Sequence, residues 1–203
     1  MAVILPTLPD WARAALQGIT FWIGHRRAMY PHYPLPEAAL VAEVCNMVHA
    51  NLRDRFRVEC EVLYSKFIKT KLTPSILTER ARADLVVREE ISKPDGIKLR
   101  TRFVIEVKRA SAGNTLINDD LRRLVAVREA RKDIRAFMFL IAEASRPSRF
   151  VSDEGSSVLG RQEIPNSTGY FRVRRTWKAA RAYSNKESAH YGCLLEAFSK
   201  DDR

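Results

Sequence analysis

The alternation of apolar and polar positions divides the chain into helical and extended segments. After Pro36, the apolar residues Leu40, Val44 and Val48 recur at steps of four, the spacing of one helical face. The basic stretch near residues 53–55 marks the expected end of this helix. An amphipathic helix is therefore predicted at the start of the main domain.

The segment before this helix has a different character. It is rich in proline and aromatic residues, Asp10 can cap a short helix within it, and the prolines of residues 31–36 must break that helix. We therefore expect residues 1–35 to form an N-terminal arm and residues 36–203 to form the main domain.

Extended segments follow, with a second helix among them. Phe56, Val58, Cys60 and Val62 alternate with charged residues, and the turn signal Ser-Lys-Pro-Asp-Gly at residues 92–96 joins two later runs into a hairpin. The predicted elements are strand 56–64, strands 82–88 and 101–108, helix 118–132 and the buried strand 136–142. Their order predicts an α/β domain with a mixed central β-sheet flanked by helices, built on an α-β-β-β-α-β core at residues 36–142.

The C-terminal part, residues 143–203, reads as a basic extension of this core. Residues 144–169 are rich in serine, glycine and proline and predict a surface loop. Residues 170–178 alternate like a strand, and we interpret residues 186–198 as a closing helix.

The net charge of the chain indicates a class of binding partner. The 203 residues include 35 basic and 24 acidic ones, which gives a formal net charge of +11. The first fifty residues carry equal numbers of both, so the excess lies after them. A polyanionic partner such as nucleic acid is indicated, although a solubilising charged surface gives the same balance.

Several classes of protein are disfavoured. No apolar run is long enough for a membrane span, and the N-terminus lacks a basic region followed by a long apolar stretch, so we expect no membrane contact and no secretory signal. Three cysteines without a C-x-x-C pair predict neither a zinc site nor a disulfide framework, and Cys45 and Cys60 read as small core residues. These features favour a cytoplasmic location. Glycine-rich phosphate loops and G-x-S-x-G elbows are absent, which argues against ATP-driven and acyl-transfer enzymes.

The hairpin carries the candidate chemistry. A three-residue loop centred on Asp95 pairs Lys93 with Ile97, and the same register puts Asp84 opposite Glu106. Alternation along the strand places Glu106 and Lys108 on one face. The sequence therefore predicts two neighbouring carboxylates with an amine beside them.

Two facing carboxylates repel each other unless a cation lies between them. Mg²⁺ suits such a pair because it takes oxygen ligands and phosphate oxygens, and Lys108 could hold or help to deprotonate an attacking water. This arrangement is suited to phosphodiester hydrolysis. In the alternative interpretation, Asp84, Glu106 and Lys108 form a solvated sheet face, and a bulge that shifts the pairing would separate them.

The pattern Ala83-Asp84 followed by Glu106-Val107-Lys108, within this order of elements, resembles the PD-(D/E)xK superfamily of nucleases, which has the restriction-endonuclease-like fold. The resemblance covers about residues 36–142. It implies that Asp84, Glu106 and Lys108 are catalytic and that Asp84, Glu106 and Val107 lie at the metal, Mg²⁺ or in its place Mn²⁺.

Many members of this family add a glutamate from the first helix. Glu43 is the better match, because Glu37 lies in the first turn, where the helix dipole alone explains an acidic residue. A solvent-facing position on the helix is the alternative for Glu43. The sequence departs from the family at the motif proline, which is Ala83 here, and it lacks the glutamine and tyrosine of the RecB-like branch.

Basic residues supply candidate contacts to nucleic acid. One group leads into the Asp84 strand, another interleaves with aromatic residues near the C-terminus, and one lies early in the second helix. The candidates are Lys69, Lys71, Arg80, Arg82, Arg122, Arg172, Arg174, Arg175 and Lys178. Alternatively, the C-terminal strand simply covers the core while its arginines face water.

Together these features predict an Mg²⁺-dependent nuclease, most readily an endonuclease on double-stranded DNA with a restriction, repair or mobile-element role. The alternatives are a catalytically inactive DNA-binding or assembly protein of the same fold, and an RNase. Because many nucleases of this fold act as dimers, the resemblance also implies a homodimer.

Overall fold

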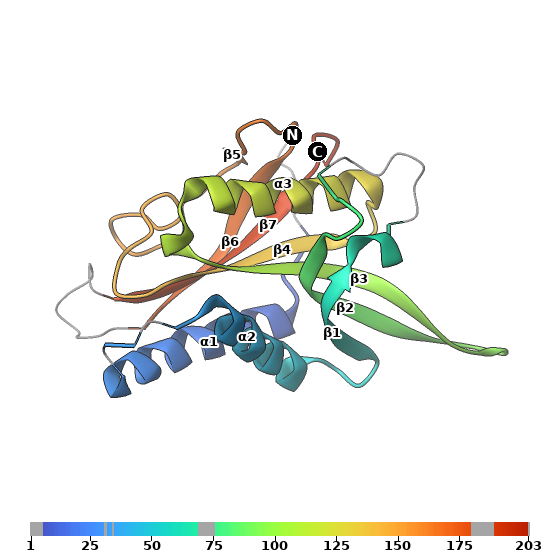
Figure 1. The fold of residues 1–203 in the computed structure, drawn as a ribbon, viewed down its shortest axis with the longest axis horizontal. Helices are drawn as coiled ribbons and strands as arrows, with labels where there is room; N and C mark the ends of the chain where they lie inside the picture. Colours follow the sequence, from blue (N-terminus) through green and yellow to red (C-terminus); the bar gives the residue numbers. More distant parts are fainter. Residues whose placement is uncertain (1–5, 31, 34, 69–75, 180–188, 203) are drawn as a thin grey trace.

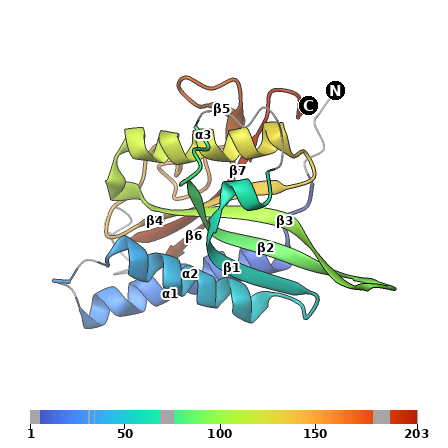
Figure 2. The same cartoon turned by 45° about the vertical axis from the view of Figure 1, so that its right-hand side comes forward.

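A seven-stranded mixed sheet lies between one helix on one face and two helices on the other (Figures 1 and 2). This computed structural model describes residues 6–30, 32–33, 35–68, 76–179 and 189–202. In chain order the elements are α1 (Asp10–Met29), α2 (Glu37–Asn51), β1 (Phe56–Leu63), η1 (Tyr64–Lys66), β2 (Arg82–Lys93), β3 (Gly96–Arg109), η2 (Ala110–Ala112), α3 (Asn114–Ala130), β4 (Arg135–Ala142), β5 (Gln162–Glu163), β6 (Tyr170–Ala179) and β7 (His190–Phe198). The α/β class and the mixed sheet predicted from the sequence are confirmed.

The strand order in the sheet is β1-β2-β3-β4-β7-β6-β5. β3 and β4 are parallel, and every other neighbouring pair is antiparallel. A parallel pair needs a crossover, and α3 provides it across one face of the sheet. The predicted order of helix, three strands, helix and strand is thus the segment from α2 to β4.

Two apolar layers hold this arrangement together. Val104 and Met138 point into the layer under α3, whereas Ile105 and Phe137 point into the layer shared with α1 and α2, and all four are fully buried. Alternate residues of the central strands therefore serve opposite layers, as their pleat requires. None of the helices in the described part of the chain has the length and hydropathy needed to cross a bilayer.

α1 belongs to the second of these layers. It is longer than the short helix expected in an N-terminal arm, and seven of its residues are buried, among them Leu16 and Ile19. It lies against α2 and crosses β6 and β7 (Figure 1). Gly192 of β7 permits the close approach, because a Cβ at this position would overlap the Thr20 hydroxyl of α1.

The closing helix predicted at residues 186–198 is wrong. Residues 180–188 lie outside the described part of the chain, and His190–Phe198 form β7, which pairs with β4 on one side and β6 on the other. All nine residues of β7 are buried. A strand covered on both faces shows no alternation of polarity, so its apolar run cannot be distinguished from a buried helix by periodicity.

The hairpin has the predicted pairing at one end and not at the other. Lys93 pairs with Gly96, not with Ile97, so the loop has two residues instead of three. A bulge between Val87 and Arg88 then shifts the register by one residue, and Leu85 pairs with Ile105 as the three-residue loop would require. The hairpin extends well beyond the body of the protein (Figures 1 and 2).

Candidate functional site

Asp84, Glu106 and Lys108 lie together where β3 ends and α3 begins. Asp84 stands near the start of β2, next to the Leu85–Ile105 pair, and its Oδ2 accepts a hydrogen bond of 2.7 Å from the N–H of Val107. Glu106 and Lys108 follow on alternate positions of β3. The structure thus brings together the three residues that the sequence singles out as catalytic, and Val107 adjoins them.

Four further side chains complete this group. They come from α2, from η1 and from the middle of α3, so that three separate elements surround the end of β3. We call the whole set the β3-end cluster: Glu37, Tyr64, Asp84, Glu106, Lys108, Asp120 and Arg123.

Glu106 is the most enclosed member of the cluster. Its residue is 2% exposed, the Tyr64 hydroxyl donates to its Oε1, and Arg123 Nε lies 3.9 Å from the same oxygen. Burial, followed by the charges of Asp84 and Asp120, raises the pKa of Glu106 well above its ordinary value. Burial likewise raises the pKa of Asp84, and the neighbouring charge of Asp120 adds to it, although the Val107 N–H acts in the opposite direction.

Lys108 is held by two carboxylates from two helices. Its Nζ lies 2.8 Å from Glu37 Oε1 in the first turn of α2 and 3.0 Å from Asp120 Oδ2 in α3. Burial alone would lower the pKa of Lys108, but the interactions with Glu37 and Asp120 outweigh burial and raise it. Lys108 is therefore a protonated cation in this environment.

The charges of the β3-end cluster do not balance. Glu37, Asp84, Glu106 and Asp120 are four acidic groups, whereas Lys108 and Arg123 are two basic ones. Full ionisation would leave a net charge of −2 beside largely buried groups, and this repulsion adds to burial, the larger cause, in raising the pKa values of Asp84 and Glu106. A divalent cation would neutralise this excess, and the oxygen donors suit Mg²⁺.

The donor set is small for a metal centre built from side chains alone. Over the residues that the structure describes, no group of three or more His, Cys, Asp or Glu side chains is arranged to hold a metal ion. An ion at Asp84 and Glu106 would thus have two carboxylate ligands, which fits a cation that keeps water and phosphate oxygens in its shell.

The glutamate that α2 contributes to the cluster is Glu37. Glu43, the residue preferred from the sequence, is half-buried on the same helix, and its Oε2 lies 3.4 Å from Asn46 Nδ2. The buried face of α2 explains this difference. At about 100° per residue, Glu37 lies about 20° from the centre of the stripe formed by Leu40, Val44 and Val48, and Glu43 lies about 100° from it. Extending the apolar stripe by one turn could have identified Glu37.

Tyr64 and Asp120 are the members that sequence reasoning missed. Tyr64 directly follows β1 and is fully buried, and Asp120 is a buried acid at 2% exposure in an otherwise amphipathic helix. Asp120 lies one position before Leu121 on the apolar side of α3, and this acid on a buried face is the signal that could have found it. Nothing in the local sequence of Tyr64 indicates its contact with Glu106.

The candidate nucleic-acid contacts near the cluster have varied positions. Lys69 and Lys71 lie outside the described residues. Arg80 and Arg82 are both exposed. Arg82 Nη1 donates a hydrogen bond of 3.0 Å to the Glu61 carbonyl. Arg122 pairs with Asp119 and donates to the Pro165 carbonyl at 3.2 Å. These arginines remain candidates for phosphate contacts.

The arginines of β6 lie on the other face of the sheet. Arg172 pairs in register with Glu196, Arg174 forms an ion pair with the same buried Glu196, and Arg175 stacks over the Trp177 ring at 4.8 Å. Glu196 and Trp177 belong to the α1–α2 side, whereas the β3-end cluster faces α3. Lys178, which is half-buried, is paired in register with Tyr191.

Cys45 packs against the apolar layer under α1 and α2, as predicted for a small core residue, whereas Cys60 is not a core residue. Cys45 is half-buried on α2 and Cys60 is exposed on β1, and their Sγ atoms lie 3.1 Å apart.

Comparison of the chain with protein-family models, with curated proteins and with solved structures gives no match.

Proposed function

We propose that this protein is an Mg²⁺-dependent nuclease that hydrolyses phosphodiester bonds in DNA, and that it is a divergent member of the PD-(D/E)xK superfamily. The observation that carries the proposal is the convergence of Asp84, Glu106 and Lys108 at the end of β3. The order α2-β1-β2-β3-α3-β4, with β3 and β4 parallel, supports a restriction-endonuclease-like arrangement of the core.

Asp84 and Glu106 would hold the metal, with the main-chain carbonyl of Val107 as a further oxygen donor. Mn²⁺ takes the same ligands. An ion held by these residues would act as a Lewis acid that stabilises charge on the scissile phosphate and lowers the pKa of its water. Binding would also relieve the repulsion that, after burial, raises the pKa values of Asp84 and Glu106.

Lys108 acts as a cation in this proposal. Because its pKa is raised, the ammonium group keeps its proton and is poorly suited to act as a general base. It would donate a hydrogen bond to the attacking water and stabilise the negative charge that develops on the phosphate. Glu37 and Asp120 orient its Nζ from two sides.

A second candidate function is nucleic-acid binding without cleavage. The ion pairs of Lys108 and the hydrogen bond from Tyr64 to Glu106 form a connected network without any ligand, as expected for a purely structural cluster. The two functions differ in whether Lys108 is needed for hydrolysis, and this difference decides the experiment.

Purified protein is incubated with supercoiled plasmid in Mg²⁺ or in EDTA, together with the Lys108→Ala variant. We expect nicking in Mg²⁺ only, and a rate at least about 100-fold lower for Lys108→Ala, as is usual when one charge-stabilising group is removed. Lys132→Ala is the matched control, because Lys132 is an exposed lysine whose ion pair within the described part of the chain is with Asp201.

Binding of the plasmid without cleavage in Mg²⁺ and in Mn²⁺ would support the second candidate. Cleavage that is equally fast in EDTA, or in the Lys108→Ala variant, would exclude the proposed site. Structured RNA is offered in the same assay, and hydrolysis of RNA alone would replace DNA as the substrate.

A further inference from the structure

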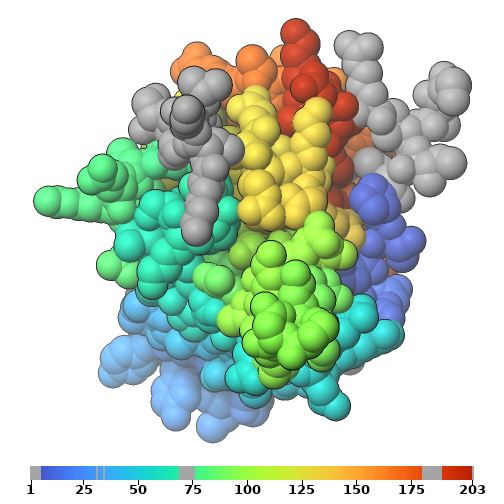
Figure 3. Space-filling model, turned by 90° about the vertical axis from the view of Figure 1, so that its right-hand side faces the viewer, coloured from blue at the N-terminus to red at the C-terminus, as the bar shows by residue number. Residues whose placement is uncertain are grey.

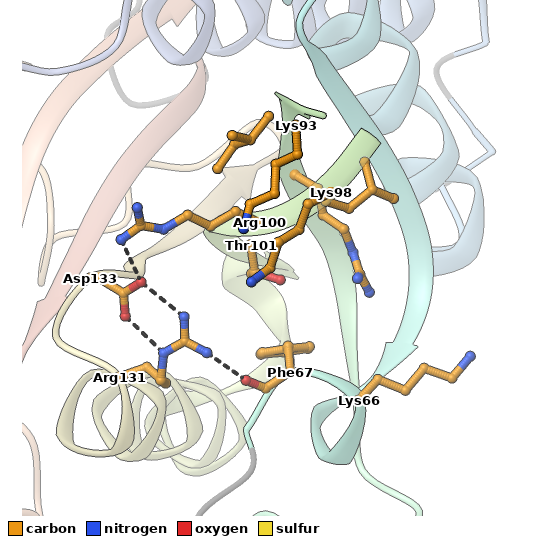
Figure 4. A pocket seen from close by; sticks show the side chains of 11 residues that line it. Lys66, Phe67, Lys93, Lys98, Arg100, Thr101, Arg131 and Asp133 are labelled. Atoms are coloured by element: carbon orange, nitrogen blue, oxygen red, sulfur yellow. Dashed lines mark hydrogen bonds and ion pairs between the residues drawn. The ribbon is translucent and has the colours of Figure 1, made fainter. Parts of the chain in front are cut away.

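A cavity of about 540 Å³ lies at the opposite end of β3 from the β3-end cluster. The β2–β3 hairpin forms one wall, the segment around Lys66 and Phe67 a second, and the residues just after α3 a third (Figure 4). Six of its eleven lining residues are Lys or Arg, and Asp133 is its single acid. We call this cavity the hairpin pocket.

Asp133 does not neutralise the pocket. Its two carboxylate oxygens lie 2.8 and 2.9 Å from Arg131, and Arg100 Nη2 lies 3.2 Å from Oδ2. The hydrogen bonds from Arg131 lower the pKa of Asp133, which is therefore fully ionised and shared between two guanidinium groups. Asp133, Arg100 and Arg131 together carry a net charge of +1, to which the lysines of the pocket add.

Lys93 and Lys98 add charge that has no counter-ion among the residues that the structure describes. Both flank the turn of the hairpin and are exposed, and their side-chain ends point toward the region between Arg100 and Arg131, whereas Lys66 projects away (Figure 4). No carboxylate among the described residues forms an ion pair with either lysine. Converging cations repel each other unless an anion joins them.

The shape and lining of the pocket specify the kind of anion. Several N–H donors converge from two elements, and guanidinium groups recognise phosphate through paired donors. The pocket opens on the face shown in Figure 3, where the hairpin tip projects toward the viewer with the end of α3 and the segment after β1 around it. A phosphate on a large, extended ligand can therefore reach it.

The hairpin pocket and the β3-end cluster are connected on the α3 side of the sheet. η1 joins them, because the Tyr64 hydroxyl reaches Glu106, and the Phe67 carbonyl accepts a hydrogen bond of 3.0 Å from Arg131 at the pocket wall. Along β3, Thr101 of the pocket and Glu106 of the cluster are separated by about 17 Å, at about 3.3 Å per residue. This corresponds to about five base steps along a nucleic-acid strand at about 3.4 Å per step.

We propose that the hairpin pocket binds a backbone phosphate of the nucleic acid whose scissile bond lies at the β3-end cluster, about five base steps away. This inference rests on the proposed function, since it places the same substrate at both sites. The pocket would fix the position of the strand without reading its sequence.

The test compares two variants of equal net charge. Lys93→Ala/Lys98→Ala removes the two lysines that point into the pocket, and Arg53→Ala/Lys200→Ala removes two exposed cations outside it, so each variant lowers the formal charge from +11 by two. Binding of a fluorescein-labelled DNA duplex is measured by fluorescence anisotropy, with Ca²⁺ in place of Mg²⁺ to prevent cleavage, at several salt concentrations.

We expect the pocket variant to bind about 10-fold more weakly and to reduce the slope of log Kd against log salt by about 1–2, at about 0.9 for each phosphate contact. The control variant should stay within about 3-fold of the original protein. Equal loss in both variants would show that only net charge matters, and unchanged binding in the pocket variant would also overturn the proposal.

The same measurements separate this inference from the proposed function. A protein that binds DNA through the pocket but never cleaves it refutes the nuclease and supports the pocket. If the protein cleaves DNA and the pocket variant binds DNA with unaltered affinity, the nuclease is supported and the pocket is refuted. Circular dichroism confirms that each variant is folded.

Discussion

Glu106 is buried between a hydroxyl and a guanidinium, and Tyr64 provides the closer of these contacts. The Tyr64 hydroxyl donates to Glu106 Oε1, and both side chains are almost completely buried. A buried carboxyl without hydrogen-bond partners is costly, and a carboxyl that rotates freely is a poor metal ligand. In the proposed metal site, Tyr64 would therefore be a positioning residue for Glu106.

Tyr64→Phe tests this role. Because it removes the hydroxyl and leaves Glu106 in place, we expect the free energy of unfolding in urea to fall by about 1–2 kcal/mol. We also expect the Mg²⁺ concentration for half-maximal cleavage to rise by about 10-fold. Tyr33→Phe is the control, since the Tyr33 residue is 69% exposed. A loss of stability with an unchanged Mg²⁺ requirement would limit Tyr64 to a structural role.

Cys45 and Cys60 are placed to form a disulfide under oxidation. Their Sγ atoms lie 3.1 Å apart, and Cys60 is exposed. Burial and the contact with Cys60 raise the pKa of Cys45 to about 12, so Cys45 reacts slowly as a thiolate and the exposed thiol must react first.

With the oxidant diamide, which is itself reduced as it accepts two hydrogen atoms, we expect both thiols to be lost together from titration with a thiol reagent. Cys193, which is buried, should stay free in the folded protein. The Cys60→Ser variant should retain the Cys45 thiol under the same treatment. Intermolecular dimers on a non-reducing gel, instead of an internal link, would contradict this expectation.

The sequence predicts the three candidate catalytic residues better than the residues that surround them. Asp84, Glu106 and Lys108 are in one strand pair, where alternation and register decide which side chains are neighbours. Asp120 and Tyr64 come from other elements, and their positions depend on how α3 and η1 pack on the sheet. The acid on the buried face of α3 marks Asp120 as unusual, but which strand residues Asp120 and Tyr64 contact depends on tertiary packing, which has no local signature.

At the scale of elements, the sequence predicts the correct register of the hairpin near Asp84, but from an incorrect loop length. The loop is one residue shorter than expected, and the bulge between Val87 and Arg88 compensates for it before the strands reach Asp84. Turn residues alone cannot reveal a bulge six residue pairs from the turn, because a bulge depends on the packing of both strands. The apolar pairs Leu85–Ile105 and Val86–Val104 fix the register near the cluster.

The contact between α1 and β7 depends on the absence of a side chain at Gly192. A Cβ there would overlap the Thr20 hydroxyl and press on Leu16 Cδ1 at 3.3 Å. We expect Gly192→Ala to lower the free energy of unfolding by about 1–3 kcal/mol, the range for overpacking in a core. Urea denaturation measures this change.

Thr20→Ala provides the partner for a double-mutant cycle. Removing the Thr20 hydroxyl makes space for the new methyl group, so Gly192→Ala should cost at least about 1 kcal/mol less in the Thr20→Ala background. Additive effects of the two changes would mean that α1 does not approach β7 as closely as the structure describes.

At the scale of the whole molecule, the positive charge is divided between two faces. On the α1–α2 side, Arg135 and Arg174 are both ion-paired with the buried Glu196, so part of the excess stabilises the fold. On the α3 side, the hairpin pocket has cations without partners among the described residues. A net charge of +11 is a property of the chain, and only packing decides which of its cations can meet a phosphate.

The C-terminal residues close the α3 layer through one ionised carboxylate. Asp202 lies 2.6 Å from Arg128 Nη2 of α3, and its Oδ2 accepts hydrogen bonds of 2.8 and 3.0 Å from the N–H and hydroxyl of Ser199. Burial alone would raise the pKa of Asp202, but the hydrogen bonds from Arg128 and Ser199 outweigh burial and lower it.

A lowered pKa in the folded state gives this carboxylate a defined effect on global stability. Its contribution is fully present above the ordinary aspartate pKa of about 3.9 and is lost as the pH falls through the lower pKa of the folded state. Asp202→Asn should therefore lower the free energy of unfolding at neutral pH by about 1–3 kcal/mol, and the difference should shrink in acid. Asp201→Asn is the matched control, because the Asp201 side chain is 73% exposed and pairs weakly with Lys132 at 3.5 Å. Thermal unfolding at neutral and acidic pH measures both variants, and a difference for Asp202→Asn that persists unchanged into acid would show that Asp202 acts through packing and not through its charge.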